Sequence, residues 1–134
     1  MGATDLILDL LSDELAVCRL PVDAAVPNWA WSGELTSITC SDDELSVVCV
    51  ADPVPDDVQH TAGWRAFQVR GPLDFGLVGI LAGLSSTLAK AEIPIFAIST
   101  YDTDYLLVRN EQLEAAVEAL TAAGYPVRET RESL

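Results

Sequence analysis

Residues 71–80, GPLDFGLVGI, and residues 98–105, ISTYDTDY, are the two segments that decide the fold of this 134-residue chain. Each of them connects segments that have the apolar pattern of regular secondary structure, and both lie inside one stretch, residues 64–131. The order of patterns along this stretch is strand, helix, two strands, helix, strand. That order is the split βαβ, or ferredoxin-like, arrangement. It predicts an α+β fold with an antiparallel sheet and helices on one face.

A glycine–proline break separates the first strand of this stretch from the first helix. Residues 64–70 are rich in β-forming side chains, which predicts the strand. Asp74 is placed to cap the helix by accepting a hydrogen bond from a free backbone N–H. Apolar side chains then recur at helical spacing, at Leu77, Ile80, Leu81, Leu84 and Leu88.

Three glycines, Gly76, Gly79 and Gly83, lie in or at the start of this helix. They are unusual because an interior glycine costs roughly 1 kcal/mol relative to alanine. One explanation is close packing of the helix backbone against its neighbours. The other is room for a ligand beside the helix N-terminus, where free N–H groups favour a carboxylate. Both explanations can hold, at different glycines.

The second half of the stretch predicts a hairpin, a helix and a short strand. Residues 95–108 contain two runs of apolar β-formers joined by a polar link at 101–103, which is typical of a hairpin. Asn110 is a candidate N-cap for the second helix, and Gly124 stands where a helix ends in a left-handed residue. Residues 126–128 predict the last strand.

The upstream half of the chain repeats part of this pattern. Residues 37–49 align with residues 96–108, since both contain a strand, an acidic turn and an apolar strand. Residues 15–20 predict a preceding strand. The segments where the two helices would lie contain prolines, which leave room only for short helices. Strand–turn–strand hairpins also resemble one another by chance, so the repeat is a hypothesis.

The chain is therefore expected to hold two ferredoxin-like units. We assign residues 1–62 to a degenerate N-terminal unit and residues 63–134 to a complete C-terminal unit, because an internal repeat decides the whole fold when it is present.

Segments 71–80 and 98–104 resemble those of small bacterial proteins with tandem ACT-like modules, and of the ACT modules of cytosolic arginine sensors of the CASTOR type. The resemblance covers about half of the chain. In that family the effector, typically an amino acid, lies between the loop before the first helix and the hairpin of a neighbouring module. The resemblance implies a set of ligand-binding residues on the loop and the hairpin: Phe75, Gly76, Leu77, Val78, Gly79, Thr100, Tyr101 and Asp104.

Composition excludes several classes of partner. The formal net charge is −14, with 7 Lys and Arg against 21 Asp and Glu, so the chain lacks the basic surface that nucleic acids need, and acidic membranes would repel it. No apolar run is long enough to cross a bilayer, and no basic segment precedes the first apolar run, so we expect neither a membrane anchor nor a secretory signal.

The cysteines and the histidine argue against disulfides and metals. Cys18, Cys40 and Cys49 are odd in number and lie in apolar segments, which suits reduced thiols in a cytoplasmic protein. With one histidine and no CxxC pair, a zinc site is not expected. We expect no cofactor and no metal.

The sequence supports a catalytic function less well than a binding function. His60 lies in a polar connector with no motif that selects a nucleophile for it. Asp102 and Asp104 fit turn formation and ligand charge pairing better than acid–base catalysis. The spacing Gly76-x-x-Gly79 is no phosphate loop, because no lysine follows it. We therefore expect a protein that is not an enzyme.

Two functional hypotheses follow. The first is a stand-alone sensor, a homodimer that binds an amino acid and regulates a partner protein in trans. Its ligand would place the carboxylate at Gly76–Gly79 and the ammonium or a basic side chain at Asp104. The second is a structural or oligomerisation module that binds no ligand. An uncharacterised small enzyme is a distant third.

Overall fold

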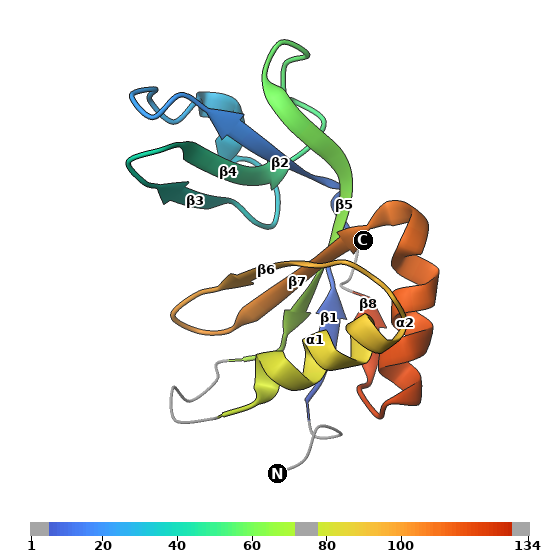
Figure 1. Cartoon of the computed structure of the whole chain (residues 1–134). Coiled ribbons are helices and arrows are strands. Elements are labelled where there is room, and N and C mark those ends of the chain that lie inside the picture. The colour runs from blue at the N-terminus through green and yellow to red at the C-terminus, as the bar shows by residue number, and fades with distance from the viewer. Residues whose placement is uncertain (1–5, 72–77, 130–134) are drawn as a thin grey trace. The chain divides into compact units, whose positions relative to one another are not determined.

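The computed structural model of the chain describes residues 6–71 and 78–129 (Figure 1). The chain divides into two compact units. Unit 1 consists of Met1–Ser12 and Arg65–Leu134, and unit 2 consists of Asp13–Trp64. Unit 2 is thus an insertion between two segments that fold together as unit 1. Both units contain strands, and the two α-helices among the described residues belong to unit 1.

Unit 2 is built on antiparallel strands in the order β3-β4-β2-β5. These strands are β2 (Leu15–Leu20), β3 (Ser37–Cys40), β4 (Leu45–Val50) and β5 (Gln59–Val69). Strand β5 contributes residues 59–64 to this unit and residues 65–69 to unit 1. The β3–β4 hairpin and the strand at residues 15–20 agree with the sequence-based prediction. In place of a first helix, the described residues contain only the 3-10 turn η2 (Asn28–Trp31).

The core of unit 2 lies on one face of these strands. Cys18 on β2 and Val47 and Cys49 on β4 are buried there, and Ala30 from η2 covers them. All three cysteines are free, and Cys40 is exposed. Burial raises the pKa of the Cys18 thiol to about 12, with a further contribution from the neighbouring Cys49. Both buried thiols therefore stay protonated at neutral pH.

Unit 1 has the strand order β6-β7-β5-β1-β8. Its elements are β1 (Leu8–Leu10), the end of β5, α1 (Ile80–Lys90), β6 (Phe96–Ser99), β7 (Asp104–Arg109), α2 (Leu113–Ala122) and β8 (Val127–Glu129). The two helices pack against each other and against one face of the sheet (Figure 1). Leu84 and Leu88 from α1 and Leu120 from α2 bury their side chains in a shared core with Phe67 and Val108 of the sheet.

Strand β1 changes the simple ferredoxin-like order. It lies between β5 and β8, antiparallel to β5 and parallel to β8. Leu8 and Leu10 point into the core of unit 1, because alternate residues of a strand face the same side of a sheet. The sequence-based boundary after residue 62 placed this segment in the N-terminal unit, whereas its pairing places residues 8–10 in unit 1.

Two local predictions need correction, and a third is not tested. Helix α1 begins at Ile80 after Gly79, and the predicted cap Asp74 lies outside the described residues, so its role stays a prediction. Asn110 is not an N-cap: it opens the 3-10 turn η3 (Asn110–Gln112), and α2 starts only at Leu113. His60 lies within β5 rather than in a connector, because β5 starts at Gln59 where it pairs with β2. Gly124 does follow the second helix with a φ of 98°.

Candidate functional site

The β6–β7 hairpin tip carries one part of the predicted ligand site, and a buried threonine anchors it. The Thr100 N–H donates a hydrogen bond of 2.8 Å to the Thr103 carbonyl, and the Thr100 hydroxyl donates one of 3.1 Å to the same oxygen. The Thr103 hydroxyl is buried and donates to the Val69 carbonyl at the end of β5. This hydrogen bond therefore joins the hairpin tip to the end of β5, where the connection to α1 begins.

Asp104 and Tyr101 differ in their surroundings on this hairpin. The Asp104 carboxylate is half-buried and accepts a hydrogen bond of 2.6 Å from the Ser99 hydroxyl across the hairpin. Tyr101, at the tip, is 80% exposed. A tyrosine so exposed presents a large aromatic surface that a ligand or another chain can cover. The nearby Tyr105 hydroxyl has a raised pKa because of burial and the negative charge of Asp102.

The start of α1 carries the other part of the predicted site. Gly79 precedes the helix with a φ of 81°, and a Cβ atom built on it would meet no heavy atom of residues 6–71 and 78–129 within 4 Å. The first helical hydrogen bond is donated by the Gly83 N–H to the Gly79 carbonyl. Val78, just before, is 90% exposed. Among the described residues, a side chain at Gly79 would therefore meet no steric obstacle.

Gly83 has a different role from Gly79. A Cβ atom at Gly83 would lie 2.8 Å from the Tyr125 hydroxyl oxygen, and Tyr125 is buried between the helices and the sheet in the core of unit 1. Gly83 therefore permits close packing of α1. The close-packing explanation therefore applies at Gly83, while Gly76 lies outside the described residues.

The basic residue that follows β5 is already paired. Arg70 donates hydrogen bonds from Nε and Nη2 to the two carboxylate oxygens of Asp9, at 3.1 and 2.7 Å. These hydrogen bonds, and then the negative charge of Asp9, raise the pKa of Arg70 above its usual value. Because Asp9 lies on β1, this bidentate pair also fastens β1 beside β5.

Of the eight predicted ligand-binding residues, five lie within the described part of the chain. Val78 and Gly79 lie on the α1 side, and Thr100, Tyr101 and Asp104 lie on the hairpin, all within unit 1. The other three, Phe75, Gly76 and Leu77, lie outside the described residues. Sequence reasoning missed Thr103, because nothing in a polar turn marks one threonine as buried.

His60 belongs to unit 2, where its Nδ1 donates a hydrogen bond of 2.6 Å to the Val58 carbonyl. Among residues 6–71 and 78–129, no group of three or more His, Cys, Asp or Glu side chains could hold a metal ion. In the same part of the chain, no helix has the length and hydropathy needed to span a membrane.

Comparison with known families agrees with the architecture of unit 1. The model of an ACT domain matches residues 59–122, which includes β5, α1, the β6–β7 hairpin and α2. The chain contains an ACT domain. A second family model, that of an N-terminal domain, matches residues 13–57 and so falls within unit 2. The resemblance of the glycine loop and the hairpin to ACT modules is confirmed.

The curated relatives of this ACT-domain protein are much longer than the matched region. The human cytosolic arginine sensor for mTORC1 subunit 1 is 34% identical over 71 residues, which is 49% of this chain and 22% of the relative. The bovine protein gives the same values. The chain therefore spans less than a quarter of these relatives.

Solved structures extend the likeness to both units. An Agobacterium tumefaciens protein is 38% identical, with a TM-score of 0.89 and 96% of each chain covered. A Vibrio cholerae protein is 17% identical, with a TM-score of 0.74, covering 91% of this chain and 92% of that one. The regulatory subunit of aspartate kinase from Thermus thermophilus is 15% identical, with a TM-score of 0.52, and the match covers 92% of this chain and 97% of that one. The last two show a shared fold.

Proposed function

We propose that this ACT-domain protein is not an enzyme but a cytoplasmic regulatory protein that binds an amino acid in unit 1. The observation that carries the proposal is the start of α1, where no heavy atom of the described residues lies within 4 Å of a Cβ atom placed on Gly79, just before this eleven-residue helix. A helix N-terminus attracts a carboxylate through its free N–H groups and its dipole. The α-carboxylate of the ligand would lie there, next to Val78 and Gly79.

The hairpin supplies the remaining contacts. In ACT modules the effector lies between the loop of one module and the hairpin of a neighbouring one, so a second copy of the chain would complete each site. Thr100 and Tyr101 would contribute polar and aromatic contacts, and Asp104 would accept the ammonium group. The high exposure of Val78 and Tyr101 supports this arrangement, because a homodimer with bound ligand would cover both side chains.

The likeness between the two units supports a further proposal. Unit 2 would be a degenerate copy of the same module, since its β3–β4 hairpin corresponds to the β6–β7 hairpin and its helices are nearly absent. We propose that the protein acts without a reaction of its own, by changing its contact with a partner protein in trans when the amino acid binds.

Titration calorimetry against the common amino acids tests the proposal. We expect one of them to bind, and Asp104→Ala to weaken its affinity by about 2–5 kcal/mol, the usual cost of removing one partner from a buried charge pair. Glu118→Ala is the matched control, because Glu118 is exposed on α2 and should bind like the parent. Equal affinity of Asp104→Ala would place the site elsewhere. If no amino acid binds at millimolar concentration, the regulatory proposal fails.

The second candidate function is an oligomerisation module without a ligand. The same exposed side chains, Val78 and Tyr101, favour it, because a subunit interface would also cover them. Sedimentation separates the two candidates: a dimer that forms without any amino acid, together with a flat thermal shift across the whole panel, supports the structural role. Ligand binding stabilises a native state in proportion to the logarithm of the ligand concentration, so a real ligand gives a dose-dependent shift.

A further inference from the structure

Strand β3 is an edge strand of the sheet in unit 2. It ends the order β3-β4-β2-β5, and among the described residues β4 is the one strand that pairs with it (Figure 1). The outer side of an edge strand carries backbone N–H and C=O groups that can pair with another chain, and proteins commonly protect such edges with charges or prolines. Residues 35–41, which include all of β3, contain neither a charged residue nor a proline.

The turn after β3 shows which backbone groups face outward. The Ser41 N–H donates a hydrogen bond of 3.0 Å to the Glu44 carbonyl, so the backbone of Ser41 bonds toward the β4 side of the hairpin. Along an antiparallel strand, residues that bond to the partner strand alternate with residues that do not. The N–H and C=O groups of Ile38 and Cys40, three and one residues before Ser41, therefore face away from β4.

Two other edge strands differ from β3. Strand β8 follows Pro126 and contains Arg128 and Glu129, so a proline and two charges protect it. Strand β6 belongs to the hairpin at which a second copy of the chain is proposed to complete the amino-acid site. Strand β3 is thus an uncharged edge for which the function proposed above gives no occupant.

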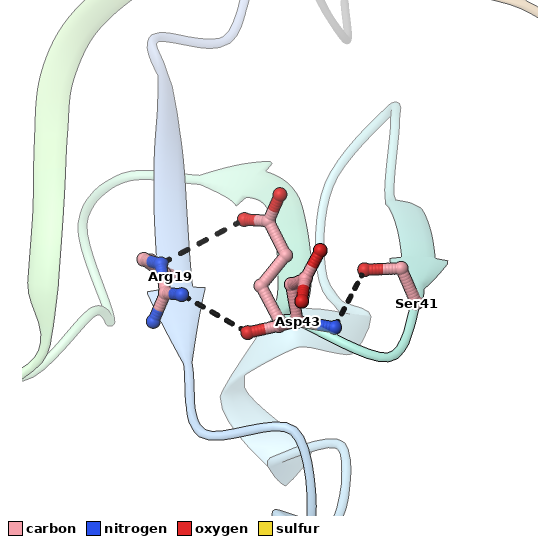
Figure 2. Close-up of polar contacts among 4 residues, drawn as sticks. Arg19, Ser41 and Asp43 are labelled. Atoms are coloured by element: carbon pink, nitrogen blue, oxygen red, sulfur yellow. Dashed lines mark hydrogen bonds and ion pairs between the residues drawn. The ribbon is translucent and has the colours of Figure 1, made fainter.

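An acidic turn of defined geometry lies at the end of β3. The Asp43 N–H donates a hydrogen bond of 3.2 Å to the Ser41 hydroxyl, and Arg19 on β2 donates one of 3.0 Å to the Asp43 carbonyl (Figure 2). Arg19 Nε also lies 4.0 Å from the Glu44 carboxylate. The side chains of Asp42 and Asp43 are exposed, and neither forms an ion pair within the part of the chain that the structure describes.

The charge of unit 2 favours a positively charged occupant over a second copy of the chain. Unit 2 contains ten Asp and Glu residues and a single arginine, so it carries most of the net charge of −14. A second copy that paired antiparallel about residue 38 or 39 would bring its Glu34 opposite Asp42 or Glu44, and like charges across a strand pair are destabilising. The same field attracts a cationic chain.

An exposed tryptophan lies near the start of β3. The Thr36 hydroxyl, one residue before the strand, donates a hydrogen bond of 2.6 Å to the Ala30 carbonyl of η2. Ala30 is buried in the core of unit 2, and the Ser32 hydroxyl donates to the Trp29 carbonyl of the same turn. Trp31, held between these contacts, is 63% exposed. Tryptophan is enriched among the residues that carry most of the binding energy of interfaces, and its ring also binds cations.

We propose that the outer edge of β3 binds an extended, positively charged segment of a partner protein, which joins the sheet of unit 2 as an added strand. Backbone hydrogen bonds to Ile38 and Cys40 would supply affinity, as in other cases of strand addition. Lys or Arg side chains of the partner would lie at Asp42 and Asp43, and an apolar or cationic side chain would cover Trp31. This surface belongs to unit 2 and does not depend on the amino-acid site proposed for unit 1.

Fluorescence anisotropy with the full chain, without added amino acid, tests this proposal on a defined probe. The probe is a labelled peptide that alternates valine and threonine and has two lysines at each end. We expect it to bind, and we expect a peptide with glutamates in place of the lysines to show no binding. A lysine peptide whose central residues are N-methylated should bind at least about tenfold more weakly, because methylation removes the backbone donors that an added strand needs.

Charge variants of the chain give a matched comparison. The double variant Asp42→Asn, Asp43→Asn should weaken binding of the lysine peptide by about fivefold or more, the effect of two exposed charge pairs. The double variant Asp56→Asn, Asp57→Asn removes the same charge from the loop before β5, at the other end of the strand order, and should change the affinity by less than about twofold. Trp31→Ala should weaken binding as well, because it removes the aromatic contact.

Several results would overturn the proposal. One is no binding of the lysine peptide at millimolar concentration, and another is equal binding of the N-methylated peptide, which would exclude an added strand. Equal weakening by the two charge variants would assign the binding to overall charge. A dimer of the chain alone that Cys40→Pro abolishes would assign the edge to a second copy, since a proline whose nitrogen faces outward is tolerated on an edge strand. The amino-acid site of unit 1 is tested separately by calorimetry and stands or fails independently.

Discussion

Gly33 has less room for a side chain than Gly79 or Gly83. It lies in unit 2 with a φ of 86°, and a Cβ atom there would lie 1.9 Å from Val50 Cγ2 and 2.8 Å from Asp13 Oδ2. The Asp13 carboxylate accepts a hydrogen bond of 2.9 Å from the Glu34 N–H, and Glu34 Oε1 accepts one from the Asp13 N–H. A methyl group at Gly33 would therefore push against β4 and against this reciprocal pair.

Gly33→Ala should destabilise unit 2 by about 2–5 kcal/mol. The left-handed backbone costs a residue with a Cβ roughly 1–2 kcal/mol. Displacing the Val50 side chain adds about 1–3 kcal/mol, the range for overpacked sites. Gly79→Ala is the matched control, because its φ of 81° is similar and its Cβ would meet nothing within 4 Å. It should cost only about 1 kcal/mol, from backbone strain alone.

Urea denaturation of the full chain measures the free energy of unfolding of both variants. The three tryptophans, Trp29, Trp31 and Trp64, all lie in unit 2, so their fluorescence reports the unfolding of that unit, while far-UV circular dichroism reports both units. The midpoint of the fluorescence transition should fall sharply for Gly33→Ala. If Gly33→Ala lowers the free energy of unfolding by no more than Gly79→Ala does, the steric argument is refuted, and the positive φ alone accounts for the destabilisation.

Three further predictions concern single side chains. Thr103→Val removes the donor to the buried Val69 carbonyl and should lower the free energy of unfolding of unit 1 by about 1–3 kcal/mol. Thr103→Ser keeps the hydroxyl, so its free energy of unfolding should fall by less than that of Thr103→Val. If chemical denaturation gives the same decrease for both variants, the hydrogen bond does not account for it. Glu92 has a φ of 62° just after α1, where the helix end favours glycine, so Glu92→Gly should raise the melting temperature by the equivalent of about 0.5–1 kcal/mol. A variant with alanine at this position should show no gain, and a gain there would point to removal of charge instead. The pKa of Cys18 is raised from 9.0 to about 12, so the folded state keeps a proton that the unfolded chain releases, and stability that is complete below pH 9 is lost as pH rises toward 12. The slope is at most about 1.4 kcal/mol per pH unit, and Cys18→Ala should flatten the alkaline limb of a stability–pH profile, whereas an unchanged slope would assign that limb to other groups.

The sequence alone determined the elements whose signals are local. The hairpins around residues 41–44 and 101–103 follow from alternating apolar residues on either side of polar turns. The helices at Ile80–Lys90 and Leu113–Ala122 follow from apolar residues at helical spacing. Their starts were predicted less well, because neither helix among the described residues has a side-chain cap at its first turn.

The segments of the candidate site were also visible in the sequence. Val78 and Gly79 precede a helix, and Thr100, Tyr101 and Asp104 lie at a hairpin tip, so the pattern located them on the correct elements. The sequence could not show that Thr103 is the residue that ties this tip to β5. Burial of one hydroxyl depends on which strands are neighbours, and a local pattern carries no information about neighbours.

Tertiary structure alone decided the pairing of distant strands. Leu8 and Leu10 have the alternation of a half-buried strand, which fixes the face that they bury but not the strands beside them. Only the fold places β1 between β5 and β8, and only the fold extends β5 back to Gln59 through its pairing with β2. The physical reason is that the hydrogen-bonding groups of a strand are the same in every residue, so the partner is chosen by the packing of the whole unit.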